Sequence, residues 1–333
     1  MIGGIVHGIS LSHGKRGLIL KQMRTVAGAA LLVAVISGCG TQAADESGQG
    51  VVKVDGGDTA GKASLDALPA APTKGLARGL TLPLHAYTIS AADGYVWHAA
   101  VRDQWRLCMA RYGFADFGPP SATPESVTAQ VDTAMGRRYG ISDLEQAKKY
   151  GYHLPRETPE APYWEPAPGA ETAVFTGKGP ELTEGTYQGK ALPEDGCRGD
   201  ARRMFPMPQS PEANEIEARV FKESRTDANV GTAVAEWASC MKKRGFERKD
   251  PLEDLDTLGI SVSSPSAGDE EIQHAVADVE CKQETRLIPL WHEGEKQHQQ
   301  RAIAREKTKL DKEKSAKDAA LNKARKSYEE AAG

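Results

Sequence analysis

Cysteine is the residue type in this sequence whose chemistry is easiest to anticipate. Five cysteines occur in 333 residues, at positions 39, 108, 197, 240 and 281. A cysteine sulfur can be acylated, can bind a metal, can act as a nucleophile or can join a second cysteine in a disulfide. The spacing contains no Cys-x-x-Cys pair, the usual sign of a zinc ligand pair or a dithiol redox centre. Acylation and disulfide formation are therefore the reactions to consider first.

The first cysteine follows a segment that is typical of export signals. Val26–Ile36 is an apolar stretch of eleven residues, too short for a bilayer span of about 20 residues but of the length of a signal-peptide h-region. Arg24 supplies the positive charge that precedes such a region. The stretch ends in Ile36-Ser37-Gly38-Cys39, which looks like a bacterial lipobox: an aliphatic residue, a small residue, Gly or Ala, then Cys.

This pattern predicts a lipid anchor. We expect residues 1–38 to be removed as a signal peptide, whether synthesis begins at Met1 or at Met23, and the Cys39 sulfur to carry a diacylglyceryl group. Acyl chains contribute about 0.8 kcal/mol per buried CH₂, so the mature protein is expected on the extracytoplasmic face of the cell membrane. A secreted protein with an unlipidated Cys39, or a misread cytosolic start, are the alternatives.

A ten-residue pattern that contains a cysteine occurs twice, 132 residues apart. Trp, Cys, Met, Gly and Phe match in type and spacing between Trp105–Phe114 and Trp237–Phe246. Helix geometry explains the pattern, since a glycine at C′ adopts the left-handed conformation and the next residue packs back on the methionine at C3. We therefore expect two helix ends of the same form and two related halves. The alternative is a ligand groove lined by Trp and Met.

The four remaining cysteines are expected to form two disulfides outside the cytoplasm. Three pairings are possible. The repeat favours Cys108–Cys197 and Cys240–Cys281, because each half then contains one bridge that starts from its Trp-Cys-Met helix. In the chain-entropy account each bridge contributes roughly 4–5 kcal/mol.

Other patterns that resemble known chemistry are incomplete. Gly56–Lys62 nearly spells a phosphate-binding loop, but Ala63 replaces the required Ser or Thr. Ser239-x-x-Lys242 has the spacing of penicillin-recognising enzymes without their companion motifs. His292 and His298 lie six residues apart, a spacing that does not place them together on one helix face. We therefore assign no catalytic, cofactor-binding or metal-binding residue, expect no cofactor, and lean towards a protein that is not an enzyme.

Composition sets the remaining limits. A mean hydropathy of −0.49 excludes a multi-span membrane protein, and a pI of about 6.1 disfavours a nucleic-acid partner. We predict a mostly α fold, a disulfide-stapled helical domain with a Pro-rich loop insert between Cys108 and Cys197 and a long charged helix at the C-terminus. The expected organisation is a signal peptide (1–38), a flexible tether (39–88), a helical domain (89–294, with halves about 89–205 and 210–294) and a solvated helical tail (295–333). Pro289 is expected to kink or interrupt the last helix of the domain.

The motifs together resemble a family of uncharacterised cell-envelope lipoproteins of high-GC actinobacteria such as streptomycetes. The residues that carry this resemblance are the lipobox, the Trp-x-x-Cys-Met-x-x-x-Gly-Phe repeat, Arg137–Ile141, Lys149–Tyr152 and the stretch from Cys281 to Trp291. The resemblance implies an envelope location and no known activity. We expect a binding or scaffolding role whose partner, besides the membrane, is an envelope protein or wall polymer. The alternatives are a component that binds a small molecule or wall polymer, and a cell-wall enzyme.

Overall fold

The computed structural model describes residues 64–155 and 164–330, and this part of the chain is mostly helical, as predicted. The signal peptide, Cys39 and the Gly56–Lys62 pattern lie outside the described residues. The elements in chain order are η1 (Leu65–Ala67), η2 (Pro83–Ala86), α1 (Ala91–Ala110), α2 (Pro124–Ala134), α3 (Leu144–Tyr150), α4 (Ala170–Thr176), β1 (Thr186–Tyr187), β2 (Lys190–Ala191), α5 (Gly196–Met204), α6 (Pro211–Ser224), α7 (Ala228–Lys243), η3 (Leu255–Leu258), α8 (Asp269–Glu284) and α9 (Leu287–Glu330). Strands β1 and β2 form an antiparallel hairpin. Among the described helices, none combines the length with the apolar content that a membrane span requires.

In the sequence Ser90-x-x-Asp93 has the spacing of a capping box, which predicts a helix start at Ser90, and α1 begins there. The Ser90 side chain accepts a hydrogen bond from the backbone N–H of Asp93 (3.0 Å), and the Asp93 carboxylate accepts one from the backbone N–H of Ser90 (3.1 Å). This reciprocal pair is a capping box, which satisfies two N–H groups that have no partner inside the helix.

Both copies of the ten-residue repeat end a helix in the same way. Gly113 and Gly245 have φ of 95° and 92°, in the left-handed region. The backbone N–H of Phe114 donates to the Met109 carbonyl (3.2 Å), and that of Phe246 donates to the Met241 carbonyl (3.0 Å). These bonds define the Schellman motif, so the predicted helix ends are confirmed. The relation between the two halves as wholes stays a prediction.

Helices α8 and α9 are separated by a short break before Pro289. Thr285 caps α8, and Arg286 has a positive φ of 54°. Pro289 is the third residue of α9, where a missing N–H costs no helical hydrogen bond. The interruption therefore falls one turn earlier than the proline itself.

The predicted tether is too long. Residues 64–88 pack on the fold, and Leu82 and Leu84 are buried. The backbone N–H of Leu84 donates to the side-chain oxygen of Gln299 on α9 (2.8 Å). The segment is rich in Gly and Pro, but it also contains leucines whose burial holds an irregular backbone on the fold.

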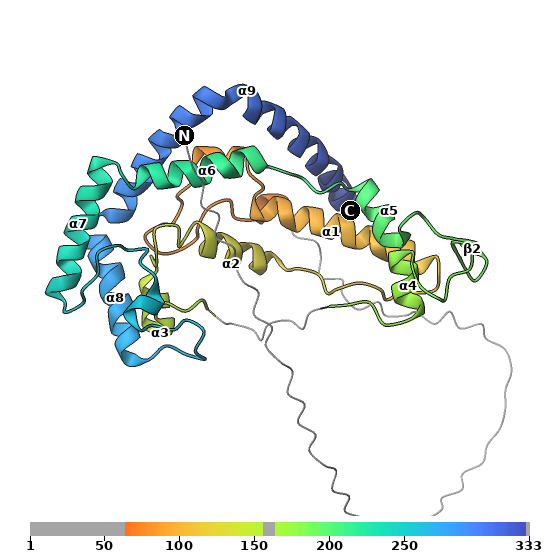
Figure 1. The fold of residues 1–333 in the computed structure, drawn as a ribbon, viewed down its shortest axis with the longest axis horizontal. Helices are drawn as coiled ribbons and strands as arrows, with labels where there is room; N and C mark the ends of the chain where they lie inside the picture. The colour runs from red at the N-terminus through yellow and green to blue at the C-terminus, as the bar shows by residue number, and fades with distance from the viewer. Residues whose placement is uncertain (1–63, 156–163, 331–333) are drawn as a thin grey trace, which may run out of the picture. The chain divides into compact units, whose positions relative to one another are not determined.

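The predicted boundary at residue 294 and the solvated tail are also wrong. Helix α9 continues through this position to Glu330, with a local break at Glu306, and lies against α6, α7 and α1 (Figure 1). Leu310, Leu321 and Ala324 on it are fully buried. The widely spaced apolar residues of α9 form a narrow stripe that is buried against the neighbouring helices, while most of its charged residues lie on the other side.

The insert between Cys108 and Cys197 combines Pro-rich connections with short helices, one of which begins after Asp143, as the Ser142–Glu145 sequence predicts. It contains α2, α3, α4 and the β1–β2 hairpin. Trp164 packs among aromatic side chains, with ring centroids 5.2 Å from Phe117 and 6.5 Å from Trp105. The insert is thus held against the first repeat helix by aromatic contacts.

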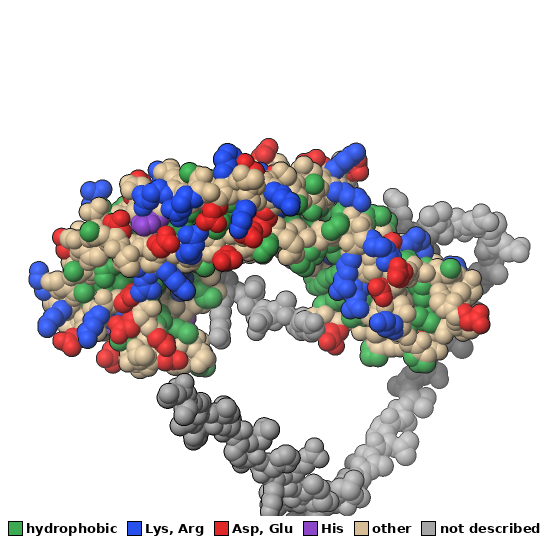
Figure 2. Space-filling view, turned by 45° about the horizontal axis from the view of Figure 1, so that its top comes forward, with side chains coloured by type: hydrophobic (Ala, Val, Ile, Leu, Met, Phe, Trp, Pro, Cys, Tyr) green, Lys and Arg blue, Asp and Glu red, His purple; other side chains and the backbone are tan. Residues whose placement is uncertain are grey.

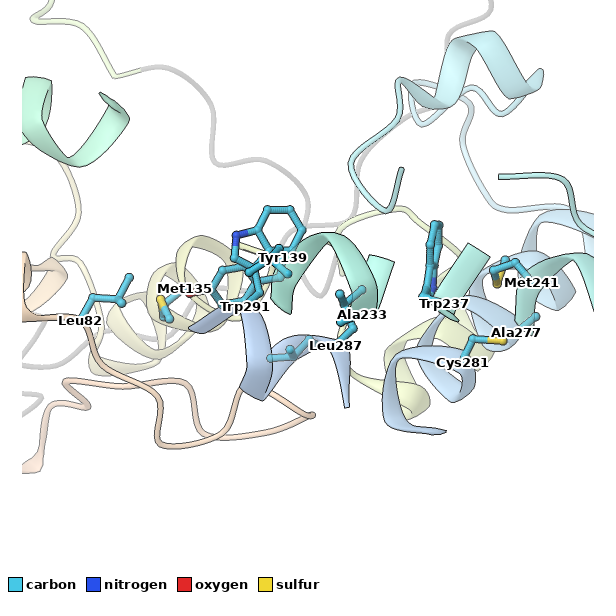
Figure 3. Packing of buried hydrophobic residues seen from close by; sticks show 12 residues of the cluster. Leu82, Met135, Tyr139, Ala233, Trp237, Met241, Ala277, Cys281, Leu287 and Trp291 are labelled. Atoms are coloured by element: carbon cyan, nitrogen blue, oxygen red, sulfur yellow. The ribbon is translucent and has the colours of Figure 1, made fainter. Parts of the chain in front are cut away.

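The largest hydrophobic cluster lies between α7, α8 and the start of α9. Trp237 and Met241 of the second repeat copy are fully buried in it, near Ala277 and Cys281, and Trp291 lies beside Tyr139 at a centroid distance of 5.3 Å (Figure 3). The repeat tryptophan and methionine are therefore core residues here, which is the structural reading of the repeat rather than a ligand groove.

Candidate functional site

Both disulfides are present with the pairing that the repeat favours. Cys108 of α1 is bonded to Cys197 of α5 with a Cα–Cα distance of 5.6 Å. Cys240 of α7 is bonded to Cys281 of α8 with a Cα–Cα distance of 5.7 Å. Each bridge joins a repeat helix to its packed neighbour. The four sulfurs therefore have a crosslinking role.

A cluster of fully buried charges lies beside the second bridge. The carboxylate of Asp278 is 3.0 Å from Nη1 of Arg248 and 3.1 Å from Nζ of Lys282, and all three side chains have no exposed surface. The same carboxylate accepts hydrogen bonds from the indole of Trp237 (2.9 Å) and the hydroxyl of Tyr152 (3.1 Å). The Asp278 carboxylate thus pairs with two cations and accepts hydrogen bonds from two neutral donors.

A second buried carboxylate, Glu295 on α9, organises another network. It accepts hydrogen bonds from the Arg138 guanidinium, the Tyr139 hydroxyl (2.9 Å) and the Gln299 amide (3.0 Å). Burial alone would lower the pKa of Arg138, but the hydrogen bonds and charge of Glu295 outweigh it and raise that pKa. Burial together with the Glu295 charge raises the pKa of Tyr139, so the phenol stays protonated.

The two short motifs of the resemblance meet at these networks. Arg137 donates to the carbonyls of Tyr152 (2.7 Å) and His153 (2.8 Å), which joins the first motif to the end of the second. Gly140 has φ of 82°, and a Cβ there would lie 2.6 Å from Nζ of Lys282. The motif residues are therefore packed in the interior of the fold, and their hydrogen bonds have a structural role.

The enzyme alternative requires a hydroxyl next to a base, and Ser264 and His153 form such a pair in the described part of the chain. The Ser264 hydroxyl is 3.4 Å from Nε2 of His153, and the Glu271 carboxylate is also 3.4 Å from Nε2. In a nucleophilic triad the acid bonds to the opposite ring nitrogen and orients the base towards the hydroxyl. Ser264 also donates to the Ser266 carbonyl (3.0 Å). This geometry pins the 261–266 loop to α8 and does not activate the serine.

The other sequence patterns also fall in structural positions. His292 contacts the Thr81 carbonyl (2.8 Å), whereas His298 lies 3.8 Å from both Glu223 and Asp227. Lys242 is exposed and pairs with Glu247. Within residues 64–155 and 164–330, no group of three metal-ligating side chains is assembled.

His274 gives the fold a dependence on pH. Its ring stacks on Phe246 at a centroid distance of 4.4 Å and meets the edge of Tyr152 at 5.7 Å. Burial, with a smaller effect of the Arg248 charge, lowers its pKa below 6.5. The unfolded chain therefore takes up a proton near pH 6.5 that the folded imidazole takes up only at lower pH, so stability is full above pH 6.5 and falls as the pH decreases.

We expect His274→Phe to reduce this dependence. The free energy of unfolding of the parent should decrease between pH 7.5 and 5.5, with His274 contributing at most about 1.4 kcal/mol per pH unit. Phenylalanine keeps the aromatic contact without the proton. Urea unfolding followed by circular dichroism at several pH values measures the slope, and an unchanged slope in the variant would contradict the assignment.

An open groove lies where the segment from Pro206 to Glu212 crosses α9. Its volume is about 600 Å³. The helix contributes one stripe at intervals of three and four residues, and the segment contributes three prolines and an exposed methionine. The lining residues are Pro206, Met207, Pro208, Gln209, Pro211, Glu212, Lys309, Lys312, Glu313, Ala316, Lys317 and Ala320.

The groove is not among the sites considered from the sequence. The signal available in the sequence was the Pro206-Met207-Pro208 segment, together with the small residues Ala316 and Ala320 four positions apart in a charged stretch. The sequence does not show that these two segments lie side by side, because about 100 residues separate residues 206–212 from residues 309–320.

Comparisons of the chain with protein-family models, curated proteins and solved structures give no match. The resemblance to actinobacterial envelope lipoproteins therefore still depends on the motifs alone.

Proposed function

We propose that this protein is a lipid-anchored extracytoplasmic protein with a non-enzymatic binding or scaffolding role at the cell envelope. Cys39 in its lipobox context supplies the anchor, and the pairing of the other four cysteines carries the proposal. Two disulfides between packed helices suit an oxidising compartment outside the cytoplasm. The lipobox at Cys39 and the two disulfides thus support the same compartment, although they lie in separate parts of the chain.

Two further observations support binding over catalysis. The polar residues of the motifs are engaged in the buried networks around Asp278 and Glu295. The groove beside α9 is accessible and largely apolar, as a binding site for a small molecule would be. Among the alternatives, the groove favours a protein that binds a small molecule.

The charge distribution agrees with a partner other than nucleic acid. On the face drawn in Figure 2, acidic and basic side chains are interspersed rather than gathered by sign. A nucleic-acid-binding surface would instead collect lysines and arginines on one face. An envelope protein, a wall polymer or a small ligand remains the proposed partner.

The anchor is tested at Cys39. Mass spectrometry of protein from its host membrane should find Cys39 as the first residue, carrying a diacylglyceryl group. We expect Cys39→Ala to move the protein from the membrane fraction to the soluble fraction, and Thr41→Ala, two residues away, to leave it in the membrane fraction. An unmodified Cys39 in the parent would contradict the proposal. Crosslinking in intact cells followed by capture then identifies the partner.

A further inference from the structure

We propose that the groove between residues 206–212 and α9 binds a single amphiphilic anion, a long-chain carboxylate. Its head group would lie at Lys309 and Lys312, and its alkyl chain along Ala316, Ala320 and Met207. This inference deepens the proposed binding role and rests on it, but it does not depend on the lipid at Cys39.

The groove has a polar end and an apolar end. The backbone N–H groups of Glu212 and Ala213 donate to the Glu313 carboxylate (2.9 and 3.0 Å), which fixes the start of α6 beside the middle of α9. At the other end of the segment, the Phe205 ring lies 5.7 Å from Nζ of Lys323. The segment therefore runs antiparallel to α9, with Lys309 and Lys312 at its Glu212 end and Ala320 towards its Pro206 end.

The apolar end is suited to an alkyl chain. Met207 lines the groove and is 61% exposed, so its apolar side chain is open to a ligand. Methionine adapts its shape to apolar ligands. Opposite it, Ala316 and Ala320 leave space because their side chains are small. An alkyl chain lying here would remove Met207 from water, and burial of apolar area is favourable.

The polar end of the groove is lined by two lysines, Lys309 and Lys312, and two carboxylates, Glu212 and Glu313, and three of these four groups already have a partner. Glu313 is neutralised in part by the two N–H groups at the start of α6, and Glu212 lies 3.8 Å from Lys309. Lys317 is buried and donates to the carbonyls of Ala86 (3.2 Å) and Thr88 (2.9 Å). Lys312 is exposed and forms no ion pair within the residues that the structure describes. An anionic head group would complement Lys312 and the exposed Lys309.

The dimensions fit one chain rather than a bilayer. Lys309 and Ala320 are eleven residues apart, about 16 Å along a helix. The opposite wall is held in place, since the Trp97 indole donates to the carbonyls of Phe205 (3.3 Å) and Pro206 (3.2 Å) and the prolines restrict the backbone. A preformed groove of this length loses little entropy when a ligand binds.

The test is calorimetric titration with dodecanoate, below the concentration at which it forms micelles. The mature chain from residue 39, with Cys39→Ala and both disulfides oxidised, is used, because it carries neither the apolar signal segment nor a lipid and needs no detergent. We expect saturable binding with one site per chain. Ala316→Trp, at an exposed position, should abolish binding by filling the groove. Lys312→Glu should weaken it about fivefold, whereas Lys326→Glu, on the same helix outside the groove, should leave it unchanged.

Each result decides part of the inference. Absence of saturable binding, or equal binding by Ala316→Trp, would overturn the groove as the site. Equal affinity for dodecanol would overturn the assignment of the lysines to the head group. Binding only to phosphatidylglycerol vesicles would mean that the partner is a membrane surface, which also overturns the proposal. Because lipidation is measured separately on the parent protein, a failure of the anchor and a failure of the groove are distinguishable.

Discussion

Replacing Asp278 with alanine is expected to destabilise the fold by about 3–5 kcal/mol, the cost of leaving a buried charge without its partner. Arg248 and Lys282 would both lose their shared counter-ion while remaining without exposed surface. The Trp237 indole would lose its acceptor as well. Such a loss is a large fraction of the 5–15 kcal/mol that usually stabilises a domain. Guanidinium unfolding with both disulfides intact measures it.

A surface carboxylate provides the matched control. Asp311 on α9 pairs with Lys307 at 2.6 Å, but its side chain is 46% exposed, so Asp311→Ala should cost at most about 1 kcal/mol. A milder variant, Asp278→Asn, keeps the shape of the side chain and removes the charge. Adding Lys282→Met to it should recover part of the lost stability, because one of the two unpaired cations is then removed. Equal losses for Asp278→Ala and Asp311→Ala would show that the buried cluster contributes no more than a surface pair.

Local rules account for what the sequence predicted well. The capping box at Ser90 and the glycine-ended helices at Gly113 and Gly245 depend on residues within one or two turns of each other, so their spacing is visible in the sequence. The disulfide pairing followed from the repeat, which tied each bridge to one helix. The helix caps thus involve neighbours along the chain, whereas the bridges join cysteines 89 and 41 residues apart and were predicted because the repeat assigns one bridge to each half.

The errors have a different origin. Glu295, Gln299 and Lys317 belong to a segment with 11 basic and 7 acidic residues, and composition assigned that segment to solvent. Their burial depends on partners that are distant in sequence, such as Tyr139 and the Thr88 carbonyl. A charged side chain is buried only where such partners are provided, and the sequence does not show which distant segments provide them.

The same reasoning explains why the groove was not predicted. One wall is an irregular Pro-rich segment and the other is a stripe of a charged helix, and neither has a recognisable motif. The groove exists because α9 changes partner along its length, from α6 to α1, and the segment between α5 and α6 crosses it in between. The site is therefore a property of packing, in contrast to Cys39, whose predicted role depends on four consecutive residues.

Removing either disulfide is expected to have an effect comparable to that of the Asp278 replacement. The bridges close segments of 89 and 41 residues, so the chain-entropy account predicts losses of about 4.6 kcal/mol for Cys108→Ala/Cys197→Ala and about 3.9 kcal/mol for Cys240→Ala/Cys281→Ala. Since each bridge also joins two packed helices, the folded state should persist in both variants at low temperature.

The order of the two losses tests the origin of the stabilisation. If the bridges act by restricting the unfolded chain, the variant that lacks Cys108–Cys197, the bridge that closes the longer loop, is the less stable of the two, by about 0.7 kcal/mol. Thermal and guanidinium unfolding of the parent and both variants, with peptide mapping to establish that the remaining bridge is intact, measure this order. A loss below about 1 kcal/mol for either bridge would mean that helix packing alone holds that pair of helices together, and that oxidation of that cysteine pair is not what stabilises the fold.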